Sequence, residues 1–523
     1  MATYASRPAW RLRTRTLAGP RVAIPLGLGA LVAVSLLIRT REISIGFWID
    51  EGISTGIADR AIGAIPHALR EDGAPPLYYM LLHYWLKLAG DSEAGVRSLS
   101  LFFALLAIPA AFWAGGAIWG TRRAAWMAAV LMAFNPFLSQ YAQEARMYTL
   151  IALLAIPVAT CFLRAYAMDM DENRRPWIAG FAISLAASLY THNWAIFLTL
   201  ACLVSFAWLY VISDRRRELL RDGLLGFGGA FVLYLPWIPT TLYQAAHTGA
   251  PWSDAPALDS LLGVPGTLLG RIPQIVLLIC AGTGLLVLWQ KREELGPKAR
   301  AAVVLAILGV LTVVVAWTMS QVSPAWANRY FAIALPPFIL LAAGGLAHAG
   351  RLGLVGLLLV VVMWAQDAAP VEKSNVRAVA RDIGPSLAPG DLVISTQPET
   401  VPVLHYYLPE GLKYATLTGP LTDLGVWDWR DGVERLNATN PEKDLKPLID
   451  ALPAGRRVVL VEPITWTLNR WRAPWTKLVR IRSKEWSQYL SDFPNLKVTA
   501  IQPPEFTPPR PNPVQATVMV KTR

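Results

Sequence analysis

The feature that most constrains the fold of this chain is a series of long apolar stretches separated by short polar loops. A helix needs about 20 residues to cross the roughly 30 Å of hydrocarbon in a bilayer. With 54% hydrophobic and only 16% charged residues, the chain has more apolar sequence than a water-soluble core would take up. The pattern predicts an α-helical polytopic membrane protein with about 11 transmembrane helices. They are expected to begin near Val22, Val96, Ala124, Tyr148, Trp177, Trp194, Gly223, Ile272, Ala301, Phe331 and Leu352.

The distribution of Lys and Arg predicts how these helices are oriented. Basic residues gather in every second loop, and cytoplasmic loops carry such an excess. The net charge of +12 is therefore interpreted as membrane orientation rather than nucleic-acid binding. The clusters are Arg7 to Arg21, Arg122 and Arg123, Arg174 and Arg175, Arg215 to Arg217, Lys291 to Arg300, and Arg351. We expect a multi-pass protein of the bacterial inner (plasma) membrane with a cytoplasmic N-terminus.

This alternation depends on how residues 75–85 are interpreted. The segment is short, opens with two prolines and is rich in aromatic residues, which suits a helix lying on the membrane surface rather than a span. The first outer loop, about residues 41–95, is then long and folded against the outer leaflet.

The character of the chain changes near residue 367, so we predict a membrane domain at 1–367 and an extracytoplasmic domain at 368–523. A helical pattern at 376–383 and a Pro389-Gly390 turn precede strand-like runs at 391–395 and 457–461, and a final strand is expected at 516–520. The pattern favours a small C-terminal α/β domain. An odd number of spans places it on the outer side.

Charged residues of the predicted outer loops are the candidates for chemistry. Asp50 and Glu51 directly follow the first span. Ionised groups at this depth are energetically unfavourable unless they form ion pairs or serve a function. A solvated loop or a helix start explains them as well when they are taken alone. Glu144 and Arg146 open a later span, and the planar guanidinium of Arg suits a phosphate, although a local Glu/Arg pair is the alternative.

Three further outer positions are weaker candidates. His192 could be an acid, a base, a metal ligand or an interfacial polar residue. Arg329, followed by Tyr330, could bind a lipid phosphate or anchor a helix by snorkelling. Asp72 stands at a turn before residues 75–85, where turn chemistry alone would explain it.

Several functions lack their signatures. The sequence has no Walker loop, no His-Glu-x-x-His and no Gly-x-Ser-x-Gly, so ATP-driven transport, zinc proteolysis and serine hydrolysis have no support. An ion-coupled transporter would carry a relay of charges in mid-span, and none is evident.

Four motifs, taken in order, resemble a known superfamily. They are residues 48–51 (WIDE), 72–79 (DGAPPLYY), 141–148 (YAQEARMY) and 190–192 (YTH). Together they resemble the GT-C membrane glycosyltransferases, in the family 39-like branch of bacterial protein O-mannosyltransferases and the lipid A aminoarabinose transferase. The resemblance implies a polyprenyl-phosphate-linked sugar as donor and a glycan, lipid or protein of the cell envelope as acceptor. The aminoarabinose pattern has a Lys where this chain reads Gly73 to Pro75, which leaves the donor sugar open.

The resemblance also implies roles for the residues. Asp50 would be the general base that takes the proton of the acceptor hydroxyl, and Arg146 and Arg329 would stabilise the leaving lipid phosphate. Carboxylates and His would orient sugar hydroxyls, hold the arginines or bind a divalent metal ion where one is used. The residues expected to bind donor or acceptor are Glu51, Asp72, Tyr78, Glu144, Arg146, Tyr148, His192, Arg329 and Tyr330.

Two alternatives remain open. A flippase or transporter for lipid-linked sugars would spread polar residues through the depth of the membrane, whereas here the charges gather on one side. A polymerase or ligase of lipid-linked glycans would share the outer-face site.

Overall fold

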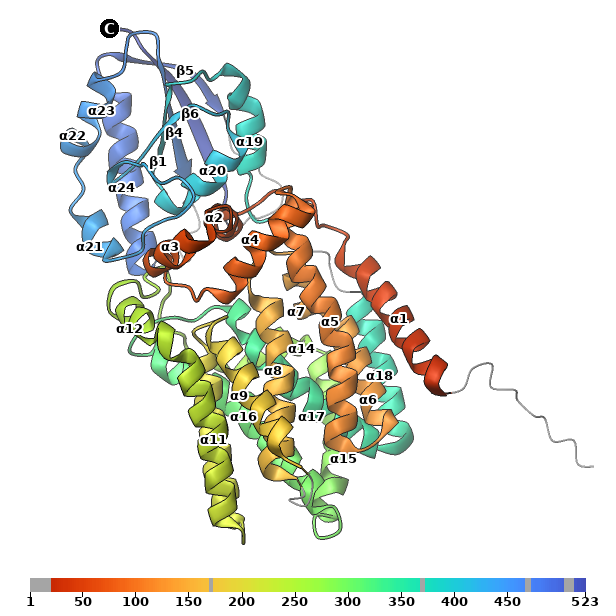
Figure 1. Ribbon diagram of the computed structural model, residues 1–523. Helices are drawn as coiled ribbons and strands as arrows, with labels where there is room; N and C mark the ends of the chain where they lie inside the picture. The colour runs from red at the N-terminus through yellow and green to blue at the C-terminus, as the bar shows by residue number, and fades with distance from the viewer. Residues whose placement is uncertain (1–19, 169–172, 367–371, 466–471, 503–511) are drawn as a thin grey trace, which may run out of the picture.

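The chain folds into a bundle of long helices that carries an α/β domain at one end (Figure 1). This computed structural model describes residues 20–168, 173–366, 372–465, 472–502 and 512–523. The arginines before residue 16, most of the proline-rich stretch after 502 and the boundary predicted at 367/368 lie outside the described residues.

A helix lies at each predicted span, and the polytopic helical fold is confirmed. Seven helices of the described chain are long and apolar enough to cross a membrane. Four others, α6, α9, α17 and α18, are only 13 to 16 residues long, so the predicted number of spans stays unconfirmed. The bundle helices are α1 (Pro20–Arg39), α5 (Glu93–Trp119), α6 (Arg122–Phe134), α8 (Tyr148–Phe162), α9 (Arg175–Leu189), α10 (Ala195–Ile212), α11 (Arg216–Tyr234), α15 (Pro273–Gln290), α16 (Gly296–Ser320), α17 (Leu335–His348) and α18 (Gly350–Ala365).

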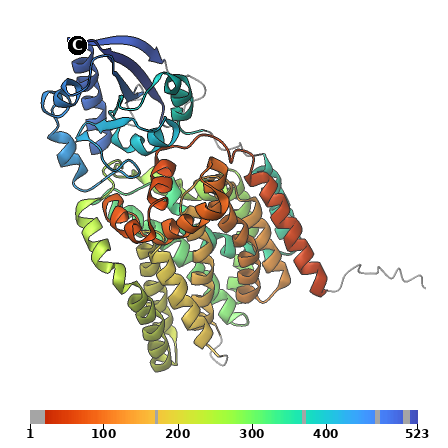
Figure 2. The same ribbon diagram turned by 45° about the horizontal axis from the view of Figure 1, so that its top comes forward.

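Three helices of the first loop lie at the end of the bundle beneath the α/β domain (Figure 2). They are α2 (Ile49–Ala58), α3 (Ile65–Asp72) and α4 (Leu77–Ala89). Helix α3 ends at Gly73, whose φ of 95° is a left-handed conformation that favours glycine. Helix α4 covers most of predicted segment 75–85, and it is not among the helices with the length and hydropathy of a span.

Short elements fill the same end of the bundle. They are η1 (Ile62–Ala64), α7 (Pro136–Tyr141), η3 (Leu235–Trp237), α12 (Ile238–His247), α13 (Leu258–Leu262), α14 (Val264–Leu269) and η4 (Asn328–Ile333). A turn of π-helix, η2 (Leu163–Ala167), extends α8.

The C-terminal domain is built on a six-stranded mixed sheet in the order β3-β2-β1-β4-β6-β5. Strand β1 is parallel to both β2 and β4, and β6 is antiparallel to β4 and β5. Figure 1 shows the strands between α19 (Val376–Ile383) and α24 (Pro474–Ser491). The strands are β1 (Leu392–Ser395), β2 (Lys413–Thr416), β3 (Gly419–Pro420), β4 (Arg457–Pro463), β5 (Leu496–Gln502) and β6 (Val514–Lys521).

This domain confirms the predicted helix at 376–383 and the strands at 391–395, 457–461 and 516–520. Its remaining helices are η5 (Gly384–Ser386), η6 (Pro398–Thr400), α20 (Val401–Tyr407), α21 (Gly432–Asn437), α22 (Pro441–Asp444) and α23 (Lys446–Asp450).

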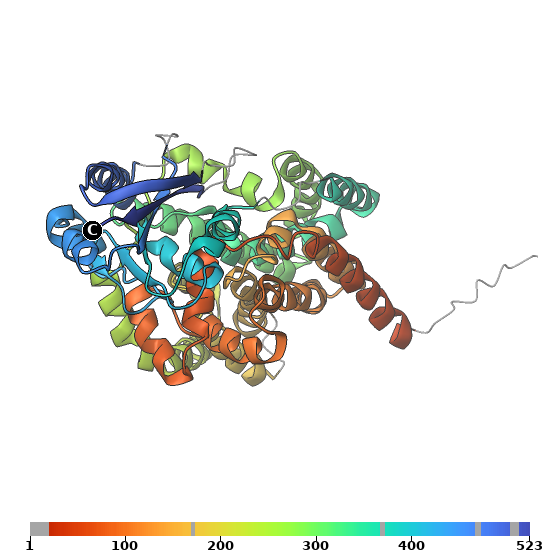
Figure 3. The same ribbon diagram turned by 90° about the horizontal axis from the view of Figure 1, so that it is seen from above.

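Ion pairs and close packing hold the C-terminal domain on the first loop. The guanidinium of Arg60 forms two hydrogen bonds of 2.5 Å with the carboxylate of Asp423. Helix α2 packs so closely that a Cβ atom at Gly56 would lie 2.3 Å from the carbonyl oxygen of Gly425. Viewed from above, the C-terminal domain and the first-loop helices cover part of the bundle end (Figure 3).

Candidate functional site

Asp50 lies in the first turn of α2 and faces two arginines from distant parts of the chain. Its Oδ2 atom is 3.6 Å from Nη2 of Arg329 and 4.0 Å from Nε of Arg146. This oxygen is buried and has no hydrogen-bond partner within the described residues. A buried charged oxygen without a partner is rare, because its lost hydration is not replaced. Asp50 therefore has lone pairs available for a bound molecule.

Arg146 is fixed by hydrogen bonds from one end of its guanidinium. Its Nη1 donates to the hydroxyl of Tyr79 at 3.0 Å and to Oγ of Ser54 at 3.2 Å. Its Nε is buried and without a hydrogen-bond partner in the described chain. The guanidinium is thus anchored while one N–H remains free to bind a ligand.

Arg329, in η4, is held by aromatic rings. Its guanidinium lies 4.9 Å from the ring centre of Trp252, 5.3 Å from that of Tyr330 and 5.6 Å from that of Trp48. Such contacts favour a cation electrostatically without consuming its N–H groups. Its Nε is also buried without a hydrogen-bond partner among the described residues. Two anchored guanidinium groups with spare donors form a site for an anion such as a phosphate.

Glu51 binds Arg97 of α5, and no hydrogen bond or ion pair joins its carboxylate to Arg146 or Arg329 within the described residues. Both side chains are 1% exposed, and the guanidinium meets both carboxylate oxygens at 2.6 and 2.7 Å. The backbone N–H of Ala145 donates to the same carboxylate at 2.9 Å. Glu51 thereby ties α2 to α5 and to the loop that carries Arg146. Sequence reasoning missed Arg97, although an Arg in the first turns of an apolar helix was a usable signal.

Glu144 binds a lysine that sequence reasoning also missed. Nζ of Lys373 is 2.5 Å from Oε1 of Glu144 and 4.2 Å from the ring centre of Trp48. The second oxygen of Glu144 is buried without a hydrogen-bond partner in the described residues. Burial raises the pKa of Glu144, and Lys373 opposes this shift. No local pattern could have linked two residues so far apart in the chain.

Asp72 lies near Arg146 and Asp50, and its carboxylate forms no hydrogen bond or ion pair within the described chain. Turn chemistry therefore does not account for it. Side-chain amides of two distant residues hold the backbone of the turn. Asn193 donates to the carbonyl of Gly73 at 3.1 Å, and Gln244 donates to the carbonyl of Ala74 at 3.2 Å. Burial raises the pKa of Asp72 to about 6, because the ionised form loses hydration.

His192 is a neutral imidazole beside the arginines. Its Nδ1 accepts a hydrogen bond of 3.1 Å from the backbone N–H of Trp194, so the ring proton is on Nε2. Burial, together with the positive charges of Arg146 and Arg329, lowers the pKa of His192 to about 3. His192 can therefore donate a hydrogen bond at neutral pH but does not supply a positive charge.

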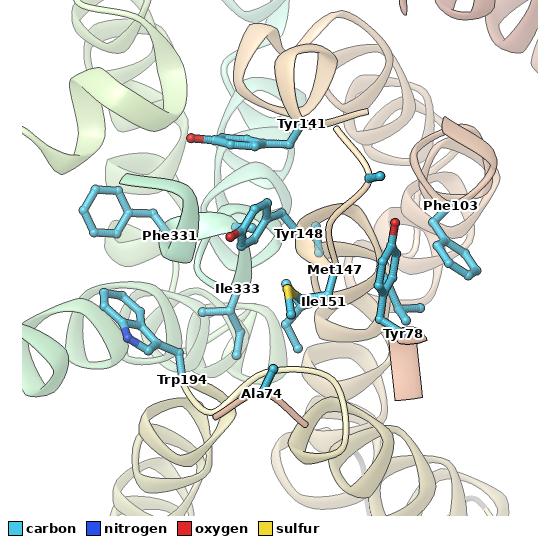
Figure 4. Close-up of a cluster of buried hydrophobic side chains, with 14 of the residues drawn as sticks. Ala74, Tyr78, Phe103, Tyr141, Met147, Tyr148, Ile151, Trp194, Phe331 and Ile333 are labelled. Carbon is cyan, nitrogen blue, oxygen red and sulfur yellow. The ribbon is translucent and has the colours of Figure 1, made fainter. Parts of the chain in front are cut away.

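Buried aromatic side chains pack beside these charged groups. Figure 4 shows the ring of Tyr148 next to that of Tyr141, and the centres of these two rings are 5.2 Å apart. The hydroxyl of Tyr148 is buried and unpartnered within the described residues. Tyr330 packs against both Tyr148 and His192, with ring centres 6.3 and 4.7 Å away.

Tyr78 and its neighbour Tyr79 have different surroundings. The hydroxyl of Tyr78 bonds Oγ of Ser100 at 2.8 Å, and that Oγ donates to the backbone carbonyl of Arg146 at 3.0 Å. Tyr78 therefore supports the arginine loop from behind, whereas Tyr79 contacts the guanidinium itself.

The described residues contain no group of three or more His, Cys, Asp or Glu side chains arranged to hold a metal ion. Their polar groups offer an anion site instead: Arg146, Arg329 and Lys373 supply positive charge around Asp50, Glu144 and Trp48.

The sequence resembles one known protein family over part of its length. Residues 73–252 match a family model described as dolichyl-phosphate-mannose-protein mannosyltransferase. No curated protein sequence matches the chain.

Solved structures match over nearly the whole chain. ArnT from Cupriavidus metallidurans in the apo state has a TM-score of 0.63 and 14% identity, covering 95% of this chain and 98% of ArnT. The same protein bound to undecaprenyl phosphate gives a TM-score of 0.60 and 15% identity with the same coverage. The arabinofuranosyltransferase AftD from Mycobacteria gives 0.52 and 16% identity, covering 95% of this chain and 40% of AftD. This chain has the fold of the GT-C membrane glycosyltransferases, the superfamily that its four motifs resemble.

Proposed function

We propose that this protein is an inverting glycosyltransferase that moves a sugar from a polyprenyl-phosphate donor to a hydroxyl group of an envelope glycan, lipid or protein. The observation that carries the proposal is the position of Asp50, with a buried unpartnered oxygen between two guanidinium groups. One side of the site suits a phosphate, and the carboxylate beside it suits the reacting hydroxyl.

In the proposed reaction the acceptor oxygen attacks the anomeric carbon as the bond from that carbon to the phosphate oxygen breaks. Asp50 takes the proton of the acceptor hydroxyl, and its charge stabilises the oxocarbenium-like transition state. The bonding electrons leave with the lipid phosphate, whose growing negative charge Arg146 and Arg329 stabilise. Attack from the side opposite the phosphate inverts the anomeric configuration.

The choice of donor rests on the surroundings of the site. Helices apolar enough to cross a membrane would keep a polyprenyl chain in lipid, and the structural relative ArnT has been solved with undecaprenyl phosphate bound. We propose that residues 1–367 form the catalytic membrane domain and 368–523 an extracytoplasmic domain. The basic loops support an active site on the outer face of the inner membrane.

Transfer of labelled sugar tests the base. Membranes that contain the Asp50→Asn variant, supplied with labelled polyprenyl-phosphate sugar, should lose about 100-fold or more of the transfer rate. The Asp59→Asn variant changes an exposed carboxylate directly after the same helix and should keep the wild-type rate. Unchanged transfer by Asp50→Asn would overturn the assignment of the base.

The same preparation distinguishes the transferase from a flippase. If purified protein in vesicles moved the lipid-linked sugar across the bilayer and glycosylated nothing, the proposed function would be wrong. A transferase instead releases polyprenyl phosphate in proportion to the sugar that is transferred.

A further inference from the structure

Lys373 comes from the start of the C-terminal domain but lies within the proposed active site. Its backbone is tied to that domain, since its carbonyl accepts a hydrogen bond of 2.9 Å from the N–H of Asn512. Its side chain extends to Glu144, in the third motif, and lies over the ring of Trp48, which opens the first. A residue of the C-terminal domain thus meets both motifs at one point.

Trp48 places Lys373 beside the predicted phosphate site. The same indole ring contacts Nζ of Lys373 at 4.2 Å and the guanidinium of Arg329 at 5.6 Å. A ligand anion that reaches Arg329 is therefore also within reach of the flexible Lys side chain. The ammonium group has three donors, and Glu144 takes one of them.

The environment of Glu144 lets the lysine leave. One oxygen of Glu144 is buried without a partner in the described residues, so its pairing with Lys373 is incomplete. Burial also favours the protonated form of this carboxyl, as its raised pKa indicates. If Nζ moved to another anion, Glu144 would take up a proton rather than remain as an uncompensated buried charge.

We propose that Lys373 is a ligand of the phosphate group of the polyprenyl-phosphate substrate and that Glu144 holds it in place while the site is empty. This proposal rests on the proposed function and adds the C-terminal domain to the donor site. The lysine, unlike the two anchored arginines, changes partner when the phosphate arrives.

Binding of undecaprenyl phosphate to purified protein in nanodiscs tests the proposal. The Lys373→Met variant keeps most of the length of the side chain and removes its charged end, and it should bind about 10- to 100-fold more weakly. Lys484→Met, which changes an exposed lysine of α24, should bind as the wild type does. Equal affinity of wild type and Lys373→Met would overturn the proposal.

A double-variant cycle separates phosphate binding from simple neutralisation of Glu144. If Lys373 binds the phosphate, the Lys373→Met substitution should lower the affinity for undecaprenyl phosphate by about the same factor in two backgrounds. These are the wild-type protein and the Glu144→Gln variant. Recovery of near wild-type affinity in the double variant would show that the lysine only compensates the carboxylate, and the proposal would be wrong.

Two further outcomes are distinguishable. Inorganic phosphate should compete only weakly, because it lacks the chain that lies in lipid; competition equal to that of the lipid would contradict a lipid-phosphate ligand. If the wild-type protein did not bind undecaprenyl phosphate at all, the proposed function would be overturned. If the wild type bound it and Lys373→Met bound it equally well, only this inference would be overturned.

Discussion

The buried pair of Glu51 and Arg97 makes the most quantitative prediction about how the site is supported. Arg97 binds both oxygens of Glu51, and its remaining N–H groups donate to the carbonyls of Ile43, Ile45 and Gly46 at 2.5 to 3.1 Å. Removing one member of such a pair leaves the other charge buried, which costs about 3–5 kcal/mol. Because native proteins are commonly stable by only about 5–15 kcal/mol, we expect Arg97→Met to be strongly destabilised.

Thermal unfolding of the purified protein, followed by tryptophan fluorescence in detergent, measures this effect. Arg97→Met should lower the unfolding midpoint, whereas Arg381→Met removes an arginine that is 71% exposed and should leave it unchanged. Glu51→Gln/Arg97→Met should be more stable than Arg97→Met, since the double variant buries no unpaired charge. A single variant as stable as the wild type, or a double variant less stable than the single one, would refute this reasoning.

Two more predictions concern stability. Burial raises the pKa of Asp72 to about 6 from an ordinary 3.8, so the folded state gains from protonation and loses this advantage as the pH rises through 6. Asp72→Asn should therefore be more stable than wild type at pH 8, by about 3 kcal/mol, and nearly equal to it at pH 4. Thermal unfolding at both pH values checks this, and a constant difference would contradict it. Gly56→Ala, with its Cβ 2.3 Å from the carbonyl of Gly425, should lose about 1–3 kcal/mol. Gly63→Ala, whose Cβ would meet nothing within 4 Å, is the matched control, and equal unfolding midpoints for the two would show that α2 does not pack tightly on the C-terminal domain.

Sequence patterns predicted those parts of the fold that depend on local hydrophobicity. Each predicted span coincides with a helix, and the alternation of basic loops groups Asp50, Arg146, His192 and Arg329 at one end of the bundle, where the structure has them. Span length was less predictable, because helices such as α17 are shorter than a bilayer requires.

The finer geometry of the site could not be predicted, because it depends on tertiary packing. Tyr78 and Tyr79 are consecutive on a helix and so point about 100° apart, and only the packing of α4 decides that Tyr79 meets Arg146. Lys373 reaches the site because the C-terminal domain packs over the first loop. A tertiary contact of this kind cannot be predicted from local sequence patterns.

The most direct test of the account is the structure of this protein with undecaprenyl phosphate bound, determined by electron cryomicroscopy in nanodiscs. In the proposed site the phosphate lies within hydrogen-bonding distance of Arg146 and Arg329, with Asp50 beside it. A phosphate that contacts neither arginine would contradict the proposed site.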